Sequence, residues 1–213
     1  IFRYPMLDSD IATFDPALSQ DTASDFAIRP VFTGLVGFND KIEVIDQLAS
    51  SHQVSADGMP YTSAINPRAK FSEGPRWTAD DVAFSIDRTL QPATKSQVTN
   101  YMSLLKDYDK ITTGRISTII GDSMIVVDAH TIKLIVSKPA AYFLSTMTYD
   151  CWYVIEKSLV TRYGTQWTEH LSEGGGAGPY MVQKWDHNKG IDLVPNPYWY
   201  GPTPKLQHIE YYQ

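Results

Sequence analysis

The segment from Thr78 to Leu90 carries the strongest structural signal in this sequence. Thr78 is a candidate helix N-cap, and Asp81 three residues later completes a capping-box pattern. Val82, Ile86 and Leu90 then recur every four residues, which places one apolar stripe along a helix. We therefore predict an amphipathic helix over residues 78–90.

Two pairs of alternating segments predict β-hairpins. Residues 53–71 turn at Asp57-Gly58, a dipeptide that favours the tight turns of hairpins. Residues 124–127 and 131–136 flank a turn at residues 128–130 and form the second hairpin. Further strands are predicted at residues 1–7, 151–155, 180–185, 191–194 and 209–212, and further helices at residues 24–35, 97–110, 142–147 and 158–163. Pro30 is expected to weaken the first of these helices unless it lies in the first turn.

Composition excludes several classes of protein. Hydrophobic residues make up 43% of the 213 residues and charged residues 20%, as in soluble globular proteins that bury a core without disulfides. The net charge is −6 and no run of Lys or Arg is present, so no nucleic-acid partner is expected. No apolar stretch reaches the ~18 residues that a membrane-spanning helix needs.

The glycine-rich run at residues 174–178 does not fit a nucleotide site. A phosphate-binding loop ends in Gly-Lys-Ser/Thr, and no lysine follows the glycines here. A dinucleotide fingerprint that starts at Gly174 and Gly176 requires a third glycine where Pro179 stands. We expect a flexible loop that precedes a strand.

Other candidates for chemistry have simpler structural interpretations. Asp80 and Asp81 point about 100° apart on a helix, so capping explains them better than a metal site or an acid–base pair. Cys151 is interpreted as a small apolar residue in a strand. The five histidines lack metal-ligand spacing, and no Gly-x-Ser-x-Gly motif occurs. We expect no enzyme activity, no metal and no cofactor.

Several segments, taken in order, resemble the family 5 extracytoplasmic solute-binding proteins, the peptide, dipeptide and nickel receptors of ABC importers. The segments are Phe14–Ala17, Phe32–Leu35, Ser55–Thr62, Lys70–Gly74, Trp77–Ser85 with Arg88, Gly178–Tyr180, Trp185, Asn196–Trp199 and Pro204–Leu206. Their order and spacing extend over the whole chain, which is more specific than any single motif. Ser63 and residues 65–69 depart from the family pattern within a hairpin, where we expect packing rather than function to change.

The resemblance implies an α/β fold of the periplasmic-binding-protein type II kind. It implies a discontinuous lobe I, formed by residues 1–36 and 150–213, and an inserted α+β subdomain formed by residues 37–149. Members of the family are considerably longer than this chain. We therefore expect the chain to be an N-terminal portion that lacks the second lobe, and the natural protein to continue beyond it.

The resemblance also implies a function. Family members enclose a peptide between two lobes, bind its backbone, and deliver it to permease subunits in the membrane. As ligand-binding residues it implies Gln20, Asp21 and Thr22, in a loop that lies along the peptide, together with Tyr101 and Trp152. We expect a monomer in the periplasm or on the extracellular face of the cytoplasmic membrane, with or without a lipid anchor.

Two alternatives remain open at this stage. One is a peptide-sensing receptor that acts on a signalling partner. The other is a receptor of the same fold for a non-peptide ligand such as a nickel chelate, an opine or an oligosaccharide. Because the groups that fix peptide termini come largely from the other lobe in this family, we expect residues 1–213 alone to bind peptide weakly.

Overall fold

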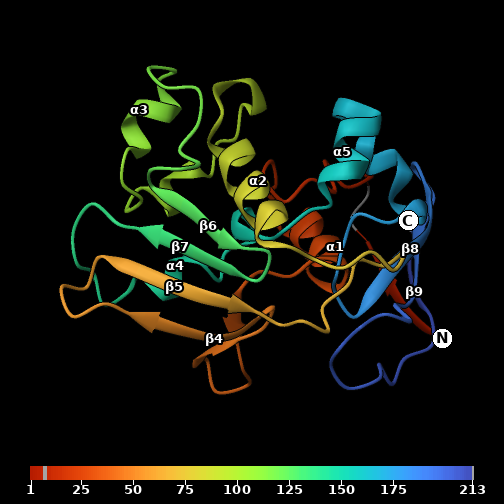
Figure 1. Ribbon diagram of the computed structural model, residues 1–213. Helices are drawn as coiled ribbons and strands as arrows, with labels where there is room; N and C mark the ends of the chain where they lie inside the picture. Colours follow the sequence, from red (N-terminus) through yellow and green to blue (C-terminus); the bar gives the residue numbers. More distant parts are fainter. Residues whose placement is uncertain (7–8, 213) are drawn as a thin grey trace.

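The computed structural model describes residues 1–6 and 9–212 of the protein. Figure 1 shows two sheets that lie apart from each other, with helices α1 (Thr22–Val31) and α2 (Ala79–Leu90) in the space between them. The remaining helices are α3 (Tyr108–Thr112), α4 (Phe143–Thr146) and α5 (Lys157–Tyr163), with 3₁₀ segments η1 (Pro92–Thr94), η2 (Thr99–Met102), η3 (Asp150–Trp152) and η4 (Gly164–Glu173). This mixture of sheets and covering helices confirms the predicted α/β class.

The first sheet joins the two ends of the chain. Its strand order is β1 (Phe2–Pro5), β10 (Ile209–Tyr212), β9 (Gly190–Pro195) and β8 (Tyr180–Asp186). β1 and β10 run parallel, with Phe2 opposite Ile209, and the other pairs are antiparallel. The four strands predicted here are confirmed, although Leu7, which the first prediction included, lies outside the described residues.

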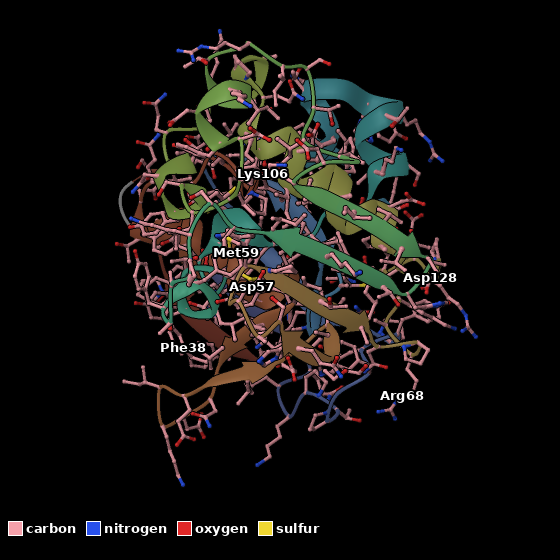
Figure 2. The ribbon with its side chains drawn as sticks, turned by 60° about the vertical axis from the view of Figure 1, so that its left-hand side comes forward. Phe38, Asp57, Met59, Arg68, Lys106 and Asp128 are labelled. Carbon is pink, nitrogen blue, oxygen red and sulfur yellow. The ribbon has the colours of Figure 1, made fainter. Side chains whose placement is uncertain are left out.

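The second sheet is antiparallel and contains both predicted hairpins. Its order is β4 (Ala49–Val54), β5 (Pro60–Ile65), β7 (Thr131–Ile135) and β6 (Met124–Asp128), and a short hairpin of β2 (Val36–Phe38) and β3 (Val44–Asp46) precedes it. Figure 2 shows Asp57 at one end of β5 and Asp128 at the opposite end of the sheet, where β6 turns into β7. The inward side chains of β5 and β7, among them Ile65 and Leu134, are buried.

The capping signal at Thr78 produces the predicted helix. The Asp81 carboxylate accepts the Thr78 backbone N–H at 3.1 Å and its hydroxyl at 2.9 Å, which completes the capping box. Val82, Ile86 and Leu90 are all at most 1% exposed, and α2 contacts β6 and β7. The stripe therefore packs on the second sheet.

The helix predicted at residues 97–110 is wrong. The chain forms η2 and α3 instead, and the break lies at Asp107, which adopts left-handed backbone angles (φ 63°). Lys110 contacts the Asp107 carboxylate at 2.6 Å, and Leu105 makes an isolated bridge to Val136. The bridge to Val136 is a tertiary contact, and it overrides the helical spacing that the sequence shows.

The boundaries of the first helix also differ from the prediction. α1 begins at Thr22, two residues before the predicted start, because Asp21 caps it. It ends at Val31 rather than at Leu35, since Phe32 is already extended. Pro30 lies in the last turn of the helix and not in the first.

The strand predicted at residues 151–155 is wrong in type but right in burial. η3 takes up its first half, and the rest is extended without a strand partner. The backbone N–H of Val154 bonds to the Thr33 carbonyl at 3.1 Å, and that of Ile155 to the Ser85 hydroxyl at 2.9 Å. Single hydrogen bonds to a loop and to a helix thus take the place of the hydrogen-bond ladder of a sheet.

The glycine run at residues 174–178, expected to be a flexible loop, is buried throughout.

Two hydrophobic clusters form the interior. One contains buried side chains from Leu35 to Val154, with Ala177. The other contains buried side chains from residues 11–32 and from residues 155–211. The predicted boundaries after residues 36 and 149 stay a prediction.

Candidate functional site

One face of α1 is left uncovered by the two cores. Thr22, Asp25, Phe26 and Arg29 follow each other at spacings of three and four residues, so they lie on the same side of the helix. Phe26 is 50% exposed, although large apolar side chains are usually buried. Asp21 begins this face as the N-cap, where its carboxylate accepts the backbone N–H of Ser24 at 2.9 Å and its hydroxyl at 2.7 Å.

A charged cluster joins this face to η3. Arg29 Nε lies 3.3 Å from Asp150 Oδ1, and Arg29 Nη2 lies 3.6 Å from Asp25 Oδ2. The side chain of Asp150 is only 5% exposed. Its burial raises the pKa of Asp150 to about 6, because the lost hydration outweighs the attraction of Arg29, and the Asp25 charge adds to the rise. The cluster therefore changes its net charge near neutral pH.

A stacked pair of tyrosines borders the charged cluster. The rings of Tyr101, from η2, and Tyr149, directly before η3, have centroids 3.6 Å apart and planes 15° apart. A hydrogen bond with Tyr101, together with burial, raises the pKa of Tyr149 to about 12. The negative charge of Asp25 adds to the rise in the pKa of Tyr149. Asp25 also accepts a hydrogen bond from Ser19. Tyr149 therefore lies between Tyr101, on which it stacks, and the charge of Asp25.

Trp152 lies behind this face rather than on it. It is 2% exposed and packs edge-on against Phe143, with ring centroids 5.8 Å apart. Its indole N–H is buried and has no hydrogen-bond partner among the described residues. In this conformation its ring does not reach a ligand on the outer surface.

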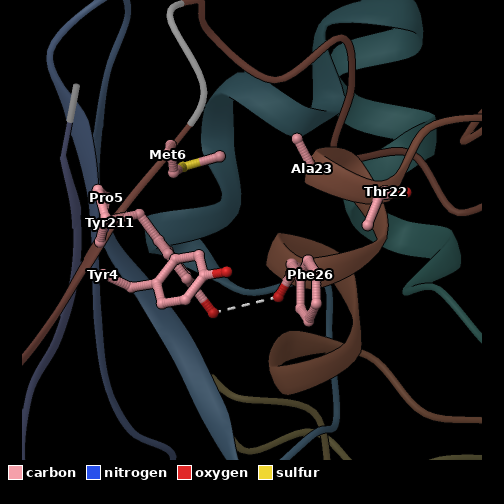
Figure 3. A pocket seen from close by; sticks show the side chains of 7 residues that line it. All are labelled: Tyr4, Pro5, Met6, Thr22, Ala23, Phe26 and Tyr211. Atoms are coloured by element: carbon pink, nitrogen blue, oxygen red, sulfur yellow. Dashed lines mark hydrogen bonds between the residues drawn. The ribbon is translucent and has the colours of Figure 1, made fainter.

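An apolar cavity opens beside Thr22 and Phe26 of this exposed face of α1. It measures about 170 Å³ and is lined by Tyr4, Pro5, Met6, Thr22, Ala23, Phe26 and Tyr211. Figure 3 shows Tyr4 and Tyr211 on one wall facing Phe26 on the other, with the Tyr211 hydroxyl donating to the Phe26 carbonyl at 3.1 Å. Thr22 thus belongs both to the predicted ligand loop and to this cavity.

The sequence interpretation identified only part of this surface. The structure places Gln20, Asp21 and Thr22 at the start of α1 and stacks Tyr101 on Tyr149, and it buries Trp152. It adds Arg29, Phe26 and Asp150, which were not singled out. The four-residue spacing of Thr22 and Phe26 was the available signal, but nothing in the sequence connects Arg29 to Asp150, which lies 121 residues later.

Within residues 1–6 and 9–212, no group of three or more His, Cys, Asp or Glu side chains is arranged to hold a metal ion. The same described residues contain no helix that is both long and apolar enough to cross a bilayer.

Comparison with known proteins identifies the family. Residues 43–213 match the model of the bacterial extracellular solute-binding proteins, family 5. The chain belongs to this family. The family is one of binding proteins and not of enzymes, in agreement with the prediction that the chain has no enzyme activity.

Relatives of the chain include glutathione-binding proteins. Those of Pectobacterium atrosepticum and Escherichia coli are each 25% identical to this chain over 202 residues, or 94% of it. The chain spans 36% of the length of these relatives.

Solved structures of other binding proteins share the fold. The substrate-binding domain of an oligopeptide ABC transporter from Bacillus anthracis superposes with a TM-score of 0.93 at 24% identity, over 99% of this chain and 40% of that one. A peptide-bound oligopeptide-binding protein from Listeria monocytogenes gives 0.91 at 21% identity, over 99% of this chain and 42% of its own. The predicted fold is confirmed, as part of a periplasmic binding protein.

Proposed function

We propose that the chain is part of the substrate-binding component of an ABC importer that captures oligopeptides or dipeptides between two lobes. The captured peptide is then delivered to permease subunits in the membrane. The observation that carries this proposal is the match of nearly the whole chain to substrate-binding domains of oligopeptide transporters. The proposed location is the periplasm or the outer face of the cytoplasmic membrane.

The exposed face of α1 supplies the chemistry that such a ligand needs. The loop from Gln20 to Thr22 offers backbone groups to an extended peptide, while Asp21 fixes the loop by capping α1. Tyr101 offers a stacked aromatic surface, and the cavity beside Thr22 accepts an apolar side chain. We assign Trp152 an indirect role, because its ring supports η3 from behind.

The proposed domain organisation follows the same logic. Lobe I is formed by residues 1–36 and 150–213, and residues 37–149 are inserted in it. The two hydrophobic clusters support this division. A second lobe, supplied by the remainder of a longer protein, then covers the ligand.

A tripeptide thiol is the second candidate ligand. The glutathione-binding relatives match 94% of this chain, which favours glutathione over opines or oligosaccharides. Calorimetric titration of the full-length protein with glutathione and, separately, with trialanine distinguishes the two assignments. Tighter binding of glutathione than of trialanine would make glutathione, rather than peptides in general, the proposed ligand.

Replacement of Tyr101 by alanine is predicted to weaken peptide binding by the full-length protein about tenfold, because the stacked surface is lost. Fluorescence titration with a labelled peptide measures the change. Tyr142→Ala is the matched control, since Tyr142 is 58% exposed and outside the site. Equal affinities for the two variants contradict the assignment of Tyr101.

Residues 1–213 alone are predicted to bind peptide weakly, because the proposed clamp needs a second lobe to enclose the ligand. Isothermal titration of this chain with a tripeptide checks the prediction. Micromolar or tighter binding contradicts it.

A further inference from the structure

The buried glycine run at residues 174–178 connects segments that belong to both hydrophobic clusters. The Gly176 carbonyl accepts the backbone N–H of Ser72 at 2.9 Å, and the Gly178 N–H donates to the Val31 carbonyl at 2.8 Å. The Gly175 carbonyl accepts the backbone N–H of Glu156 at 3.1 Å. The loop is therefore a joint between the β5–α2 connection, the end of α1 and the start of α5.

Two carboxyl groups meet at this joint. Glu156 is 4% exposed, and its Oε2 accepts the Gly175 N–H at 3.1 Å while the Ser158 hydroxyl donates to Oε1. The carboxyl group of Glu73 lies on Gly174, where an added Cβ would come within 2.1 Å of Glu73 Oε1. Glu73 itself belongs to the connection between β5 and α2, so the two carboxyls approach the same dipeptide from different segments.

The positive charges near Glu73 and Glu156 do not offset the negative charge of the carboxyl groups gathered there. Glu173 of η4 adds a third carboxylate, which accepts hydrogen bonds from Tyr163 at 2.7 Å and from His170 Nδ1 at 2.8 Å. Arg162 of α5 is a nearby cation, which acts to lower the pKa of Glu73. The charge of Glu156 also contributes to raising the pKa of Asp81 in α2. Lys157, which follows Glu156, is exposed and lies over Phe84. Burial first, then a hydrogen bond with Glu156 and its charge, raise the pKa of Glu73 to about 7.

We propose that Glu73 and Glu156 form a proton-controlled clasp, in which one proton held between the two carboxyls keeps the loop at residues 70–76 on the glycine joint. Loss of that proton leaves two carboxylates facing each other across Gly174 and Gly175. The exposed partner, Glu73, then turns toward water, and the Ser72 bond to Gly176 opens more often. The clasp thus sets how firmly the two cores are joined, which is a different property from ligand capture.

The sign of the pH dependence follows from the raised pKa. The folded protein holds the proton more tightly than the unfolded chain, whose glutamates have a pKa near 4.5. The clasp is therefore fully closed below about pH 4.5 and is lost as pH rises through about 7. Between about pH 4.5 and 7, the opening equilibrium is expected to increase about tenfold for each pH unit, since opening then releases one proton, and above pH 7 it is expected to level off.

Two measurements on the unaltered protein test the clasp. A carboxyl ¹³C NMR titration is expected to show Glu73 titrating near pH 7. Amide exchange at Ser72, corrected for its intrinsic rate, is expected to accelerate between about pH 4.5 and 7 and to level off above pH 7. Titration of Glu73 near 4.5, or exchange at Ser72 that does not change with pH, overturns the proposal.

Glu73→Gln separates the clasp from a general effect of charge. Glutamine keeps the size and hydrogen-bonding capacity of the protonated acid, so this variant is expected to remove the acceleration at Ser72 between about pH 4.5 and 7. The control Glu173→Gln removes a neighbouring charge and leaves the pair, so the acceleration is expected to persist at a slightly lower pH. The same pH dependence in Glu73→Gln as in the unaltered protein contradicts the clasp.

Discussion

Replacing Arg88 by methionine is expected to lower the free energy of unfolding by about 3–5 kcal/mol, a large part of the stability of a typical domain. Arg88 Nη2 lies 2.5 Å from Asp15 Oδ2, and the side chains are 18% and 5% exposed. The Trp167 indole N–H also donates to Asp15, at 3.3 Å. Methionine fills similar space but leaves the buried Asp15 carboxylate without its cation. Urea unfolding followed by tryptophan fluorescence measures the loss.

The control for this experiment is Arg162→Met. Arg162 is 60% exposed on its side chain and lies 3.8 Å from Glu173, so its loss is expected to leave the unfolding midpoint unchanged. The double variant Asp15→Asn/Arg88→Met is expected to recover part of the stability, because the unpaired charge is gone. Equal midpoints for Arg88→Met and Arg162→Met contradict the role of this ion pair.

Gly176→Ala is expected to cost about 3 kcal/mol, because its Cβ would lie 2.2 Å from the Val31 carbonyl oxygen. A backbone atom at the end of α1 cannot rotate away as a side chain does, so the joint or the helix must shift. Thermal unfolding and urea unfolding both report this loss.

Gly121→Ala is the matched control for the glycine joint. Gly121 has a positive φ of 94° but no atom within 4 Å of an added Cβ. The cost there is backbone strain alone, about 1 kcal/mol. If Gly176→Ala is no more destabilising than Gly121→Ala, the glycine run is not the tight joint described above.

Local signals in the sequence predicted those elements whose causes are local. The capping residues Thr78 and Asp81 and the turn at Asp57-Gly58 act within a few residues, and both elements were found. Asp107 was not foreseeable, because its carboxylate accepts a hydrogen bond from Ser123, 16 residues later in the sequence. The segment after Cys151 was rightly predicted to be buried, but its partners lie far away in the sequence, on Thr33 and Ser85.

Residues of the candidate site were predicted only in segments that correspond to the family. Gln20–Thr22 and Tyr101 came from segment correspondence, and their role in binding stays a prediction. Arg29 and Asp150 were missed, because an ion pair between residues so far apart becomes visible only when α1 and η3 are placed together. Trp152 was predicted to bind the ligand because it is aromatic. Aromatic side chains also pack in cores, and Trp152 is buried there.

Native mass spectrometry of the full-length protein as purified, followed by denaturation and identification of any released ligand, tests peptide capture most directly. The proposed function predicts a mass above that of the protein alone and the release of short peptides. Release of a sugar, a metal chelate or another non-peptide ligand would contradict peptide capture while leaving the fold and family intact.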